Sequence, residues 1–82
     1  MTTPEIRRKF LEILDYVLGC KQNTVHDNSD LIRDLRADSL ELLELVLECE
    51  LEFAVDLPNA ASDLKTVKDW LHFLEQQLTK ND

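Results

Sequence analysis

The stretch Asp34-Leu35-Arg36-Ala37-Asp38-Ser39-Leu40-Glu41 decides the fold of this chain and contains its most informative residue. Asp38 is a favourable N-cap residue, and Glu41, three positions later, completes the pattern of a capping box. Neither Gly nor Pro interrupts the run from Leu40 to Phe53, so we predict a long helix whose first residue is Ser39. Unpaired backbone N–H groups and the helix dipole would stabilise an anion attached to the hydroxyl of that serine.

The length and the charge of the chain narrow the classes of function. The 82 residues are enough for one small domain, residues 1–82, and too few for a large enzymatic cleft. The formal net charge is −8, and between Asp27 and Asp56 ten acidic residues stand against two basic ones. Nearly all of the net acidity therefore surrounds Ser39. This argues against nucleic acid and anionic membranes as partners and favours basic protein surfaces.

The cysteines, the apolar runs and the N-terminal residues give expectations about metal sites, disulfides and location. Cys20 and Cys49 are too few for a disulfide scaffold, and no metal-ligand spacing joins them to His26 or His72. We expect both cysteines to be small buried or half-buried hydrophobic residues, and we expect no metal site. No apolar run approaches the length of a membrane span, and Met1–Glu5 has no signal-peptide pattern. The expectation is a cytoplasmic monomer without membrane insertion.

Helical periodicity runs through most of the chain and predicts an all-α fold. Pro4 and Glu5 open a first helix after Thr2 or Thr3 as its cap, and Gly19 ends it. The apolar face of this helix is predicted to comprise Ile6, Phe10, Ile13, Leu14, Val17 and Leu18.

The connection from Cys20 to Ala37 is rich in Asn, Asp and Ser, yet apolar residues recur in it. These residues are Val25, Leu31, Ile32 and Leu35. We expect them to hold the connection onto the core, because an unstructured segment of this length is uncommon in a compact domain and is usually functional.

The second helix, from about Ser39 to Ala54, carries two apolar stripes at helical spacing. The stripe predicted to face the core comprises Leu42, Leu45, Val46, Cys49 and Phe53. The other stripe comprises Leu40, Leu43, Leu47 and Leu51, interleaved with Glu41, Glu44 and Glu48. We interpret this second stripe as a surface for a partner, with burial beneath the preceding connection as the alternative.

The rest of the chain completes the predicted architecture. After Leu57-Pro58, residues 59–63 allow one or two helical turns, and Thr66 caps a last helix. The apolar face of that helix comprises Val67, Trp70, Leu71, Leu74 and Leu78. The prediction is a small four-helix bundle with a long loop between the first two helices and a short third helix.

Several short motifs follow one another in a fixed order along the chain. Asp-Leu-Arg-Ala-Asp-Ser-Leu at residues 34–40 is followed by Glu44-Leu45-Val46, Glu50-x-Glu52-Phe53, Leu57-Pro58 and Thr66-Val67. In this order, and with this spacing between Gly19 and Ser39, the chain resembles acyl carrier proteins over nearly its whole length. The signature serine of that family receives a phosphopantetheine arm from coenzyme A.

The resemblance implies a role for each matching residue. Ser39 would be the attachment site of 4′-phosphopantetheine, and Asp38 would be the acid that a phosphopantetheinyl transferase and its metal recognise. The surface that meets acyl-processing enzymes through their basic docking patches would comprise Leu40, Glu41, Leu43, Glu44, Leu47 and Glu48. An acyl chain, as cargo, would lie in the bundle interior against the core stripe of the second helix, Leu71 and Leu74.

The arrangement predicts carriage of a group and not catalysis, so no catalytic residue is assigned. His26 and His72 lie on other elements than Ser39, and no third residue is placed to orient either ring as a base. A calcium loop of the EF-hand type starting at Asp27 is excluded, because Ile32 stands where that loop needs Gly.

Some positions depart from the family pattern. Arg36 stands where Gly is usual and Arg33 where an acid is common, and each either contacts the prosthetic phosphate or a partner, or is simply solvated. The stretch after Pro58 is a residue shorter than in housekeeping fatty acid carriers, and residues 59–61 replace acids. The resemblance implies a carrier for fatty acid biosynthesis, and these departures keep alternatives open. The alternatives are a dedicated carrier of a specialised lipid, polyketide, aminoacyl or peptidyl pathway, and an unmodified acidic helical adaptor protein.

Overall fold

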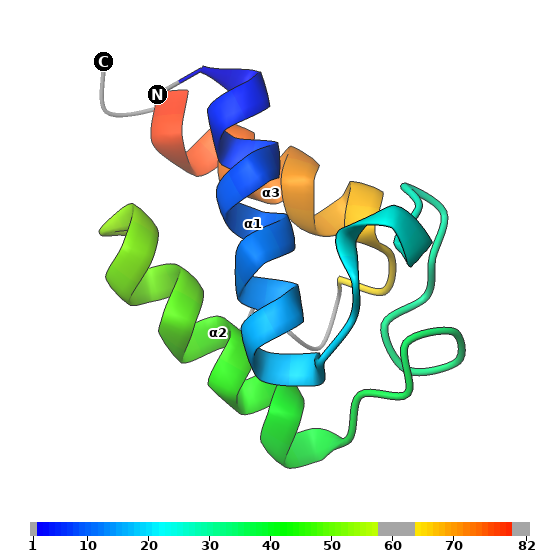
Figure 1. The fold of residues 1–82 in the computed structure, drawn as a ribbon. Coiled ribbons are helices and arrows are strands. Elements are labelled where there is room, and N and C mark those ends of the chain that lie inside the picture. Colours follow the sequence, from blue (N-terminus) through cyan, green and yellow to red (C-terminus); the bar gives the residue numbers. More distant parts are fainter. Residues whose placement is uncertain (1, 58–63, 80–82) are drawn as a thin grey trace.

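The computed structural model describes residues 2–57 and 64–79, and in these ranges the chain is all-α (Figure 1). The elements of the described part are α1 (Thr3–Leu18), the 3₁₀ helix η1 (Gln22–Thr24), α2 (Ser39–Phe53) and α3 (Val67–Thr79). The all-α class and the three longer helices are confirmed. The short helix predicted at 59–63 lies outside the described residues. No helix in the described ranges is both long and apolar enough to cross a membrane.

The first helix is defined by its two ends. Thr2 is the N-cap, and its hydroxyl accepts a hydrogen bond from the Glu5 N–H at 3.4 Å, while Pro4 lies in the first turn. At the other end Gly19 has a φ of 70°, and its N–H donates to the carbonyl oxygen of Asp15 at 2.8 Å. Helix α1 therefore begins and ends as the sequence predicts.

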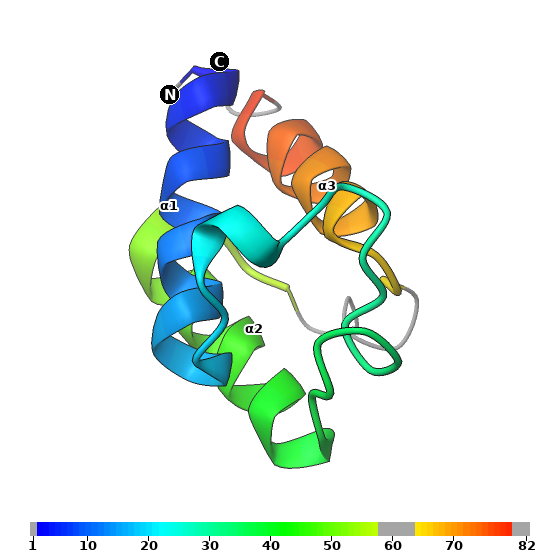
Figure 2. The ribbon, with the colours of Figure 1, turned by 45° about the vertical axis from the view of Figure 1, so that its right-hand side comes forward.

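Helix α1 packs against both α2 and α3, and the core lies between them (Figure 2). Phe10 of α1 and Trp70 of α3 are fully buried and stack with their ring centroids 5.6 Å apart. Helix α2 contributes Leu45, Val46, Cys49 and Phe53 to the buried core, with Leu42 partly buried beside them. This burial confirms the predicted core stripe of α2. Each fully buried side chain of this size stabilises the fold by about 1.5–3 kcal/mol.

The connection 20–37 runs from the end of α1 to the start of α3 before it returns to α2 (Figure 2). Backbone hydrogen bonds join it to the segment that opens α3. The Leu31 N–H donates to the carbonyl oxygen of Lys65 at 2.9 Å, and the Val67 N–H donates to the carbonyl oxygen of Ser29 at 3.1 Å. These bonds fix the connection at a point far from either of its ends.

The apolar residues of the connection behave as predicted with one exception. Val25 and Leu31 are buried, and Leu35 packs partly buried against the core. The prediction for Ile32 was wrong, because its side chain is 62% exposed. Residues 30–33 turn around the carboxylate of Asp30, which accepts the Ile32 N–H at 2.9 Å. In such a turn two adjacent side chains cannot both face the core, and Leu31 takes that place.

Candidate functional site

The serine singled out by the sequence lies at the first position of α2, where a reciprocal cap fixes the end of the helix. The Glu41 N–H donates to Asp38 Oδ1 at 2.8 Å, and the Asp38 N–H donates to Glu41 Oε1 at 3.0 Å. The backbone of Asp38 is extended, with φ −96° and ψ −179°. The capping box predicted from the sequence is therefore confirmed.

The Ser39 hydroxyl is available to other molecules. The residue is exposed, and within residues 2–57 and 64–79 its hydroxyl forms no hydrogen bond. Neither histidine ring forms a hydrogen bond with it in these ranges, and Nε2 of His72 instead lies 3.1 Å from Nε2 of Gln76. A hydroxyl without a base beside it suits modification by another enzyme better than nucleophilic catalysis.

The turn ahead of α2 sets the position of Ser39. Ala37 is buried, and its N–H donates to the carbonyl oxygen of Leu31 at 2.9 Å. Arg36, one residue earlier, has a φ of 61°, in the left-handed region where a side chain costs about 1–2 kcal/mol. Gly would adopt this angle without that cost. The strain was not predicted, although the Gly that is usual at this position in the family that the chain resembles is a signal for such an angle.

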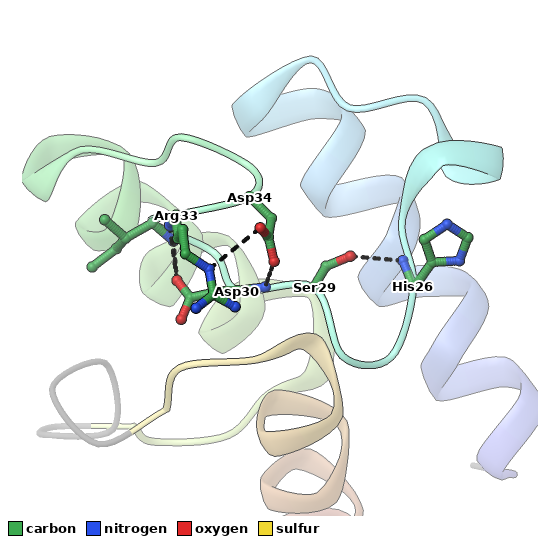
Figure 3. A network of polar contacts seen from close by, with 6 residues as sticks. His26, Ser29, Asp30, Arg33 and Asp34 are labelled. Atoms are coloured by element: carbon green, nitrogen blue, oxygen red, sulfur yellow. Dashed lines mark hydrogen bonds and ion pairs between the residues drawn. The ribbon is translucent and has the colours of Figure 1, made fainter.

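A polar network shapes the connection just before that turn (Figure 3). Asp30 Oδ1 accepts the N–H groups of Ile32 and Arg33 at 2.9 and 2.8 Å, and Asp34 Oδ2 accepts the Asp30 N–H at 2.7 Å. The hydrogen bond from the Asp30 backbone lowers the pKa of the Asp34 carboxyl below its usual value, and the charge of Arg33 acts in the same direction. Sequence reasoning gave these aspartates no role, although two Asp residues four positions apart in a turn-rich segment are a usable signal.

The acidic residues of α2 are not all equally available. Glu41 completes the cap. Glu50 accepts the Leu57 N–H at 3.0 Å, which anchors the chain after the helix. Glu52 pairs with Lys9 of α1 at 2.8 Å. These three acids are therefore engaged within the fold, and the sequence did not predict the contacts of the last two.

The remaining face of α2 combines free acids with exposed leucines. Glu44 and Glu48 form no hydrogen bond or ion pair with any residue in the described ranges. The second apolar stripe lies beside them, and its exposed fractions are 71% for Leu40, 55% for Leu43, 50% for Leu47 and 78% for Leu51. This stripe lies outside the core, so burial beneath the connection 20–37 is excluded.

Comparisons with known proteins agree with this geometry. The chain matches the family model of the phosphopantetheine attachment site over residues 8–74. It is 32% identical over 77 residues to the acyl carrier proteins of Rickettsia canadensis (strain McKiel) and Rickettsia prowazekii (strain Madrid E), over 93% of this chain and 90% of each relative. The chain belongs to the acyl carrier protein family. Members of this family are carriers and not catalysts, so this protein is not an enzyme.

The fold is similar to that of a solved acyl carrier protein. The solution structure of the apo doublet acyl carrier protein from prodigiosin biosynthesis matches with a TM-score of 0.79 and 26% sequence identity. The match covers 92% of this chain and 37% of that chain, so this acyl carrier protein spans little more than a third of the doublet.

The prosthetic group of the family is 4′-phosphopantetheine, and the residues of this acyl carrier protein fit it. An exposed hydroxyl at a capped helix N-terminus suits a phosphodiester. The thiols of the chain do not substitute for the thiol of the arm. Burial raises the pKa of Cys49 to about 12, and burial followed by the charges of Asp15 and Glu41 raises the pKa of Cys20. Both are free and stay protonated near neutral pH, as expected of buried or half-buried hydrophobic residues.

A pocket of about 360 Å³ lies beside the first turn of α2. Its described lining is Asp30, Leu31, Ile32, Arg33, Leu42, Leu64 and Lys65. Leu42 belongs to the predicted core stripe and follows Ser39 by three positions, which places both residues on neighbouring parts of the helix surface. Leu71 and Leu74, expected to hold an acyl chain, do not line this pocket, and Leu74 is fully buried in the core. The pocket combines three distant segments, so no sequence spacing indicates it.

Proposed function

We propose that Ser39 Oγ is the attachment atom for 4′-phosphopantetheine and that this carrier delivers acyl groups to the enzymes of fatty acid biosynthesis. The observation that carries the assignment is the hydroxyl of Ser39, which is exposed at the first position of the capped α2 and has no hydrogen-bond partner among the described residues. When bound, the arm supplies the thiol that holds the acyl group as a thioester. The proposal also includes one domain over residues 1–82, a monomeric state and a cytoplasmic location.

The surroundings of Ser39 support attachment by a phosphopantetheinyl transferase. The reaction forms a bond between Ser39 Oγ and the phosphorus of the arm and breaks the pyrophosphate P–O bond of coenzyme A, so that the nucleotide half, 3′,5′-adenosine bisphosphate, leaves and the serine hydroxyl loses its proton. The N-terminus of α2 then stabilises the new negative charge by about 0.3–1 kcal/mol. Asp38 Oδ1 is held by the cap, while its second oxygen accepts no hydrogen bond within the described ranges. We assign that oxygen to recognition by the transferase and its metal.

The outer face of α2 is the proposed docking surface for the transferase and for acyl-processing enzymes. Leu40, Leu43 and Leu47 supply its apolar part, and their exposure leaves this area free for contact. Glu44 and Glu48 supply charges without partners in the described ranges. Glu41 adds a charge at the edge of the surface, although it is already held by the cap. Basic patches on the partners would speed encounter, and high salt would weaken this effect.

A dedicated carrier of a specialised pathway is the second candidate. It is favoured by the similarity to an acyl carrier protein from prodigiosin biosynthesis. Loading a series of acyl groups of increasing length and measuring thermal stability separates the two functions. A fatty acid carrier should gain stability as longer chains are buried, and a carrier of other cargo should show no change beyond that of the bare arm.

The attachment is tested by intact mass. The protein is incubated with coenzyme A, magnesium and a broad-specificity transferase, in parallel with Ser39→Ala. We expect the mass of one phosphopantetheine on the parent and none on the variant. Circular dichroism of both proteins controls for folding. No addition to a folded parent would overturn the assignment and favour the unmodified adaptor.

The docking surface is tested with two substitutions of equal charge change. Glu44→Gln removes an acid from the outer face of α2, while Glu12→Gln removes an exposed acid from α1 that pairs only with Arg8 in the described ranges. We expect Glu44→Gln to lower the kcat/KM of the transferase roughly 3-fold at low salt and Glu12→Gln to leave it unchanged. Equal effects of the two substitutions would indicate that the transferase responds to the net charge of the carrier and not to a defined docking surface on α2.

A further inference from the structure

The pocket beside the first turn of α2 has apolar walls and a charged edge. Leu31, Leu42 and Leu64 line it together with the aliphatic side chain of Ile32. Its described lining also contains two bases, Arg33 and Lys65, and one acid. Among the described residues the lining is therefore net positive, in a chain whose formal net charge is −8.

The acid of the pocket is already engaged, whereas its bases are largely available. Asp30 Oδ1 accepts two backbone hydrogen bonds. The ammonium group of Lys65 forms no ion pair with any carboxylate of residues 2–57 and 64–79. Among the residues that the structure describes, the guanidinium of Arg33 pairs only with its neighbour Asp34, with Nε 3.5 Å from Oδ1, and this contact leaves the terminal guanidinium nitrogens open. By contrast, the three bases at residues 7–9 of α1 each pair with a carboxylate.

We propose that this pocket selects an acyl cargo whose far end carries a carboxylate, which Arg33 and Lys65 bind. The proposal rests on Ser39 as the attachment point of the arm. Leu42 lies one turn after that serine, so the cargo, which is held at the far end of the arm, reaches the pocket when the arm folds back along the first turn of α2. The methylene part of the cargo would contact Leu31 and Leu42, and its carboxylate would reach the guanidinium and the ammonium.

The chemistry of the pocket edge separates this cargo from a plain fatty acyl group. A carboxylate forms charge-assisted hydrogen bonds with Arg and Lys, and Arg presents two parallel donors to it. A terminal methyl group at the same place would cover both cations without giving them a partner, and removing cations from water without a partner is unfavourable. Arg33 and Lys65 are therefore the residues that determine cargo specificity.

The test compares two cargoes that differ only at their far end. A broad-specificity transferase loads Ser39 from hexanoyl-coenzyme A or from adipoyl-coenzyme A, which have the same number of acyl carbons, and intact mass verifies each product. We expect the adipoyl form to unfold about 2–4 °C above the hexanoyl form. High salt should reduce this difference. General repulsion from an acidic chain would act in the opposite direction.

Three variants assign the effect to the pocket. Arg33→Gln and Lys65→Gln should each reduce the difference between the two cargoes, while Lys68→Gln, at an exposed position of α3 outside the pocket lining, should preserve it. Equal unfolding temperatures for the two cargoes on the parent would overturn the cargo proposal and leave the attachment at Ser39 standing. A loss of stability in Arg33→Gln that is the same for the bare arm and both cargoes would also overturn it, because the cations would then bind the phosphate. Absence of any mass addition would overturn both proposals.

Discussion

Helix α2 and the connection 20–37 meet at Ser39, but they are held in place in different ways. The helix is held by buried side chains such as Leu45 and Cys49. The connection has few buried side chains and is held mainly by hydrogen bonds to its backbone, such as those around Asp30. The site therefore combines a helix that tolerates changes of charge with a connection that depends on single polar contacts and backbone angles.

A cavity in the helix core should have the largest effect. Leu45→Ala removes a side chain with no exposed surface, so we expect a loss of about 2–5 kcal/mol in the free energy of unfolding. Leu43→Ala is the matched control on the outer face, 55% exposed, and should change stability by less than about 0.5 kcal/mol. Urea unfolding measures both. A similar loss in the two variants would contradict the assignment of Leu43 to an open surface.

A substitution at Asp38, where the connection joins α2, should have an intermediate effect on the free energy of unfolding. Asp38→Ala removes the cap of α2 and should cost about 1 kcal/mol in the free energy of unfolding. Asp38→Asn keeps a side-chain oxygen for the Glu41 N–H and should be nearly as stable as the parent.

The two junction variants also separate stability from recognition. If the transferase and its metal recognise the carboxylate, Asp38→Asn should lose most of its rate of modification while its unfolding curve stays unchanged. Rate assays and urea unfolding on the same samples measure this. Full modification of Asp38→Asn would show that the transferase does not recognise the negative charge of this residue.

The two regions also differ in how far the sequence predicts them. The start of α2 follows from Asp38 and Glu41 alone, because a reciprocal cap is a local pattern. The exposure of the second stripe follows from the geometry of a helix, since the core already takes the face that includes Leu45 and Val46. Local patterns and helical spacing were thus sufficient for the start of α2 and for its two faces, but not for the contacts of Glu50 and Glu52.

The connection was predictable only in part. Burial of Val25 and Leu31 follows from their apolar character, but which of Leu31 and Ile32 faces the core depends on the turn around Asp30. The contacts of this segment with residues 65–67 are made by backbone groups, which are the same in every residue and leave no mark in the sequence. The pocket depends on these contacts and was missed for the same reason.

A substitution that changes the backbone of the connection should raise the free energy of unfolding, whereas Leu45→Ala and Asp38→Ala should lower it. Arg36→Gly relieves the left-handed backbone angle, but it also increases the entropy of the unfolded chain. We expect a net gain of about 0.5–1 kcal/mol in the free energy of unfolding. Arg36→Ala is the control, because it removes the charge and keeps the strain, and it should leave stability nearly unchanged. A gain of equal size in both variants would assign the effect to the side chain.

The smallest effect should come from the pH dependence of the polar network. The pKa of Asp34 in the folded protein lies below its usual value of 3.8, mainly because the carboxylate accepts the Asp30 N–H. Its stabilising contribution is therefore complete above the pKa of the unfolded chain and is lost as the pH falls through 3.8 toward the folded pKa. We expect Asp34→Asn to be less stable than the parent at neutral pH, with a difference that shrinks as the solution becomes acidic.

Urea unfolding midpoints from neutral pH down to below 3.8 measure that difference. Asp56→Asn is the control, because the carboxylate of Asp56 accepts no hydrogen bond within residues 2–57 and 64–79. Leu45→Ala provides the contrast with α2: its deficit should stay constant over the same range, since a cavity carries no titratable group. A deficit of Asp34→Asn that is equally constant would show that the carboxylate holds the connection by its shape and not by its charge.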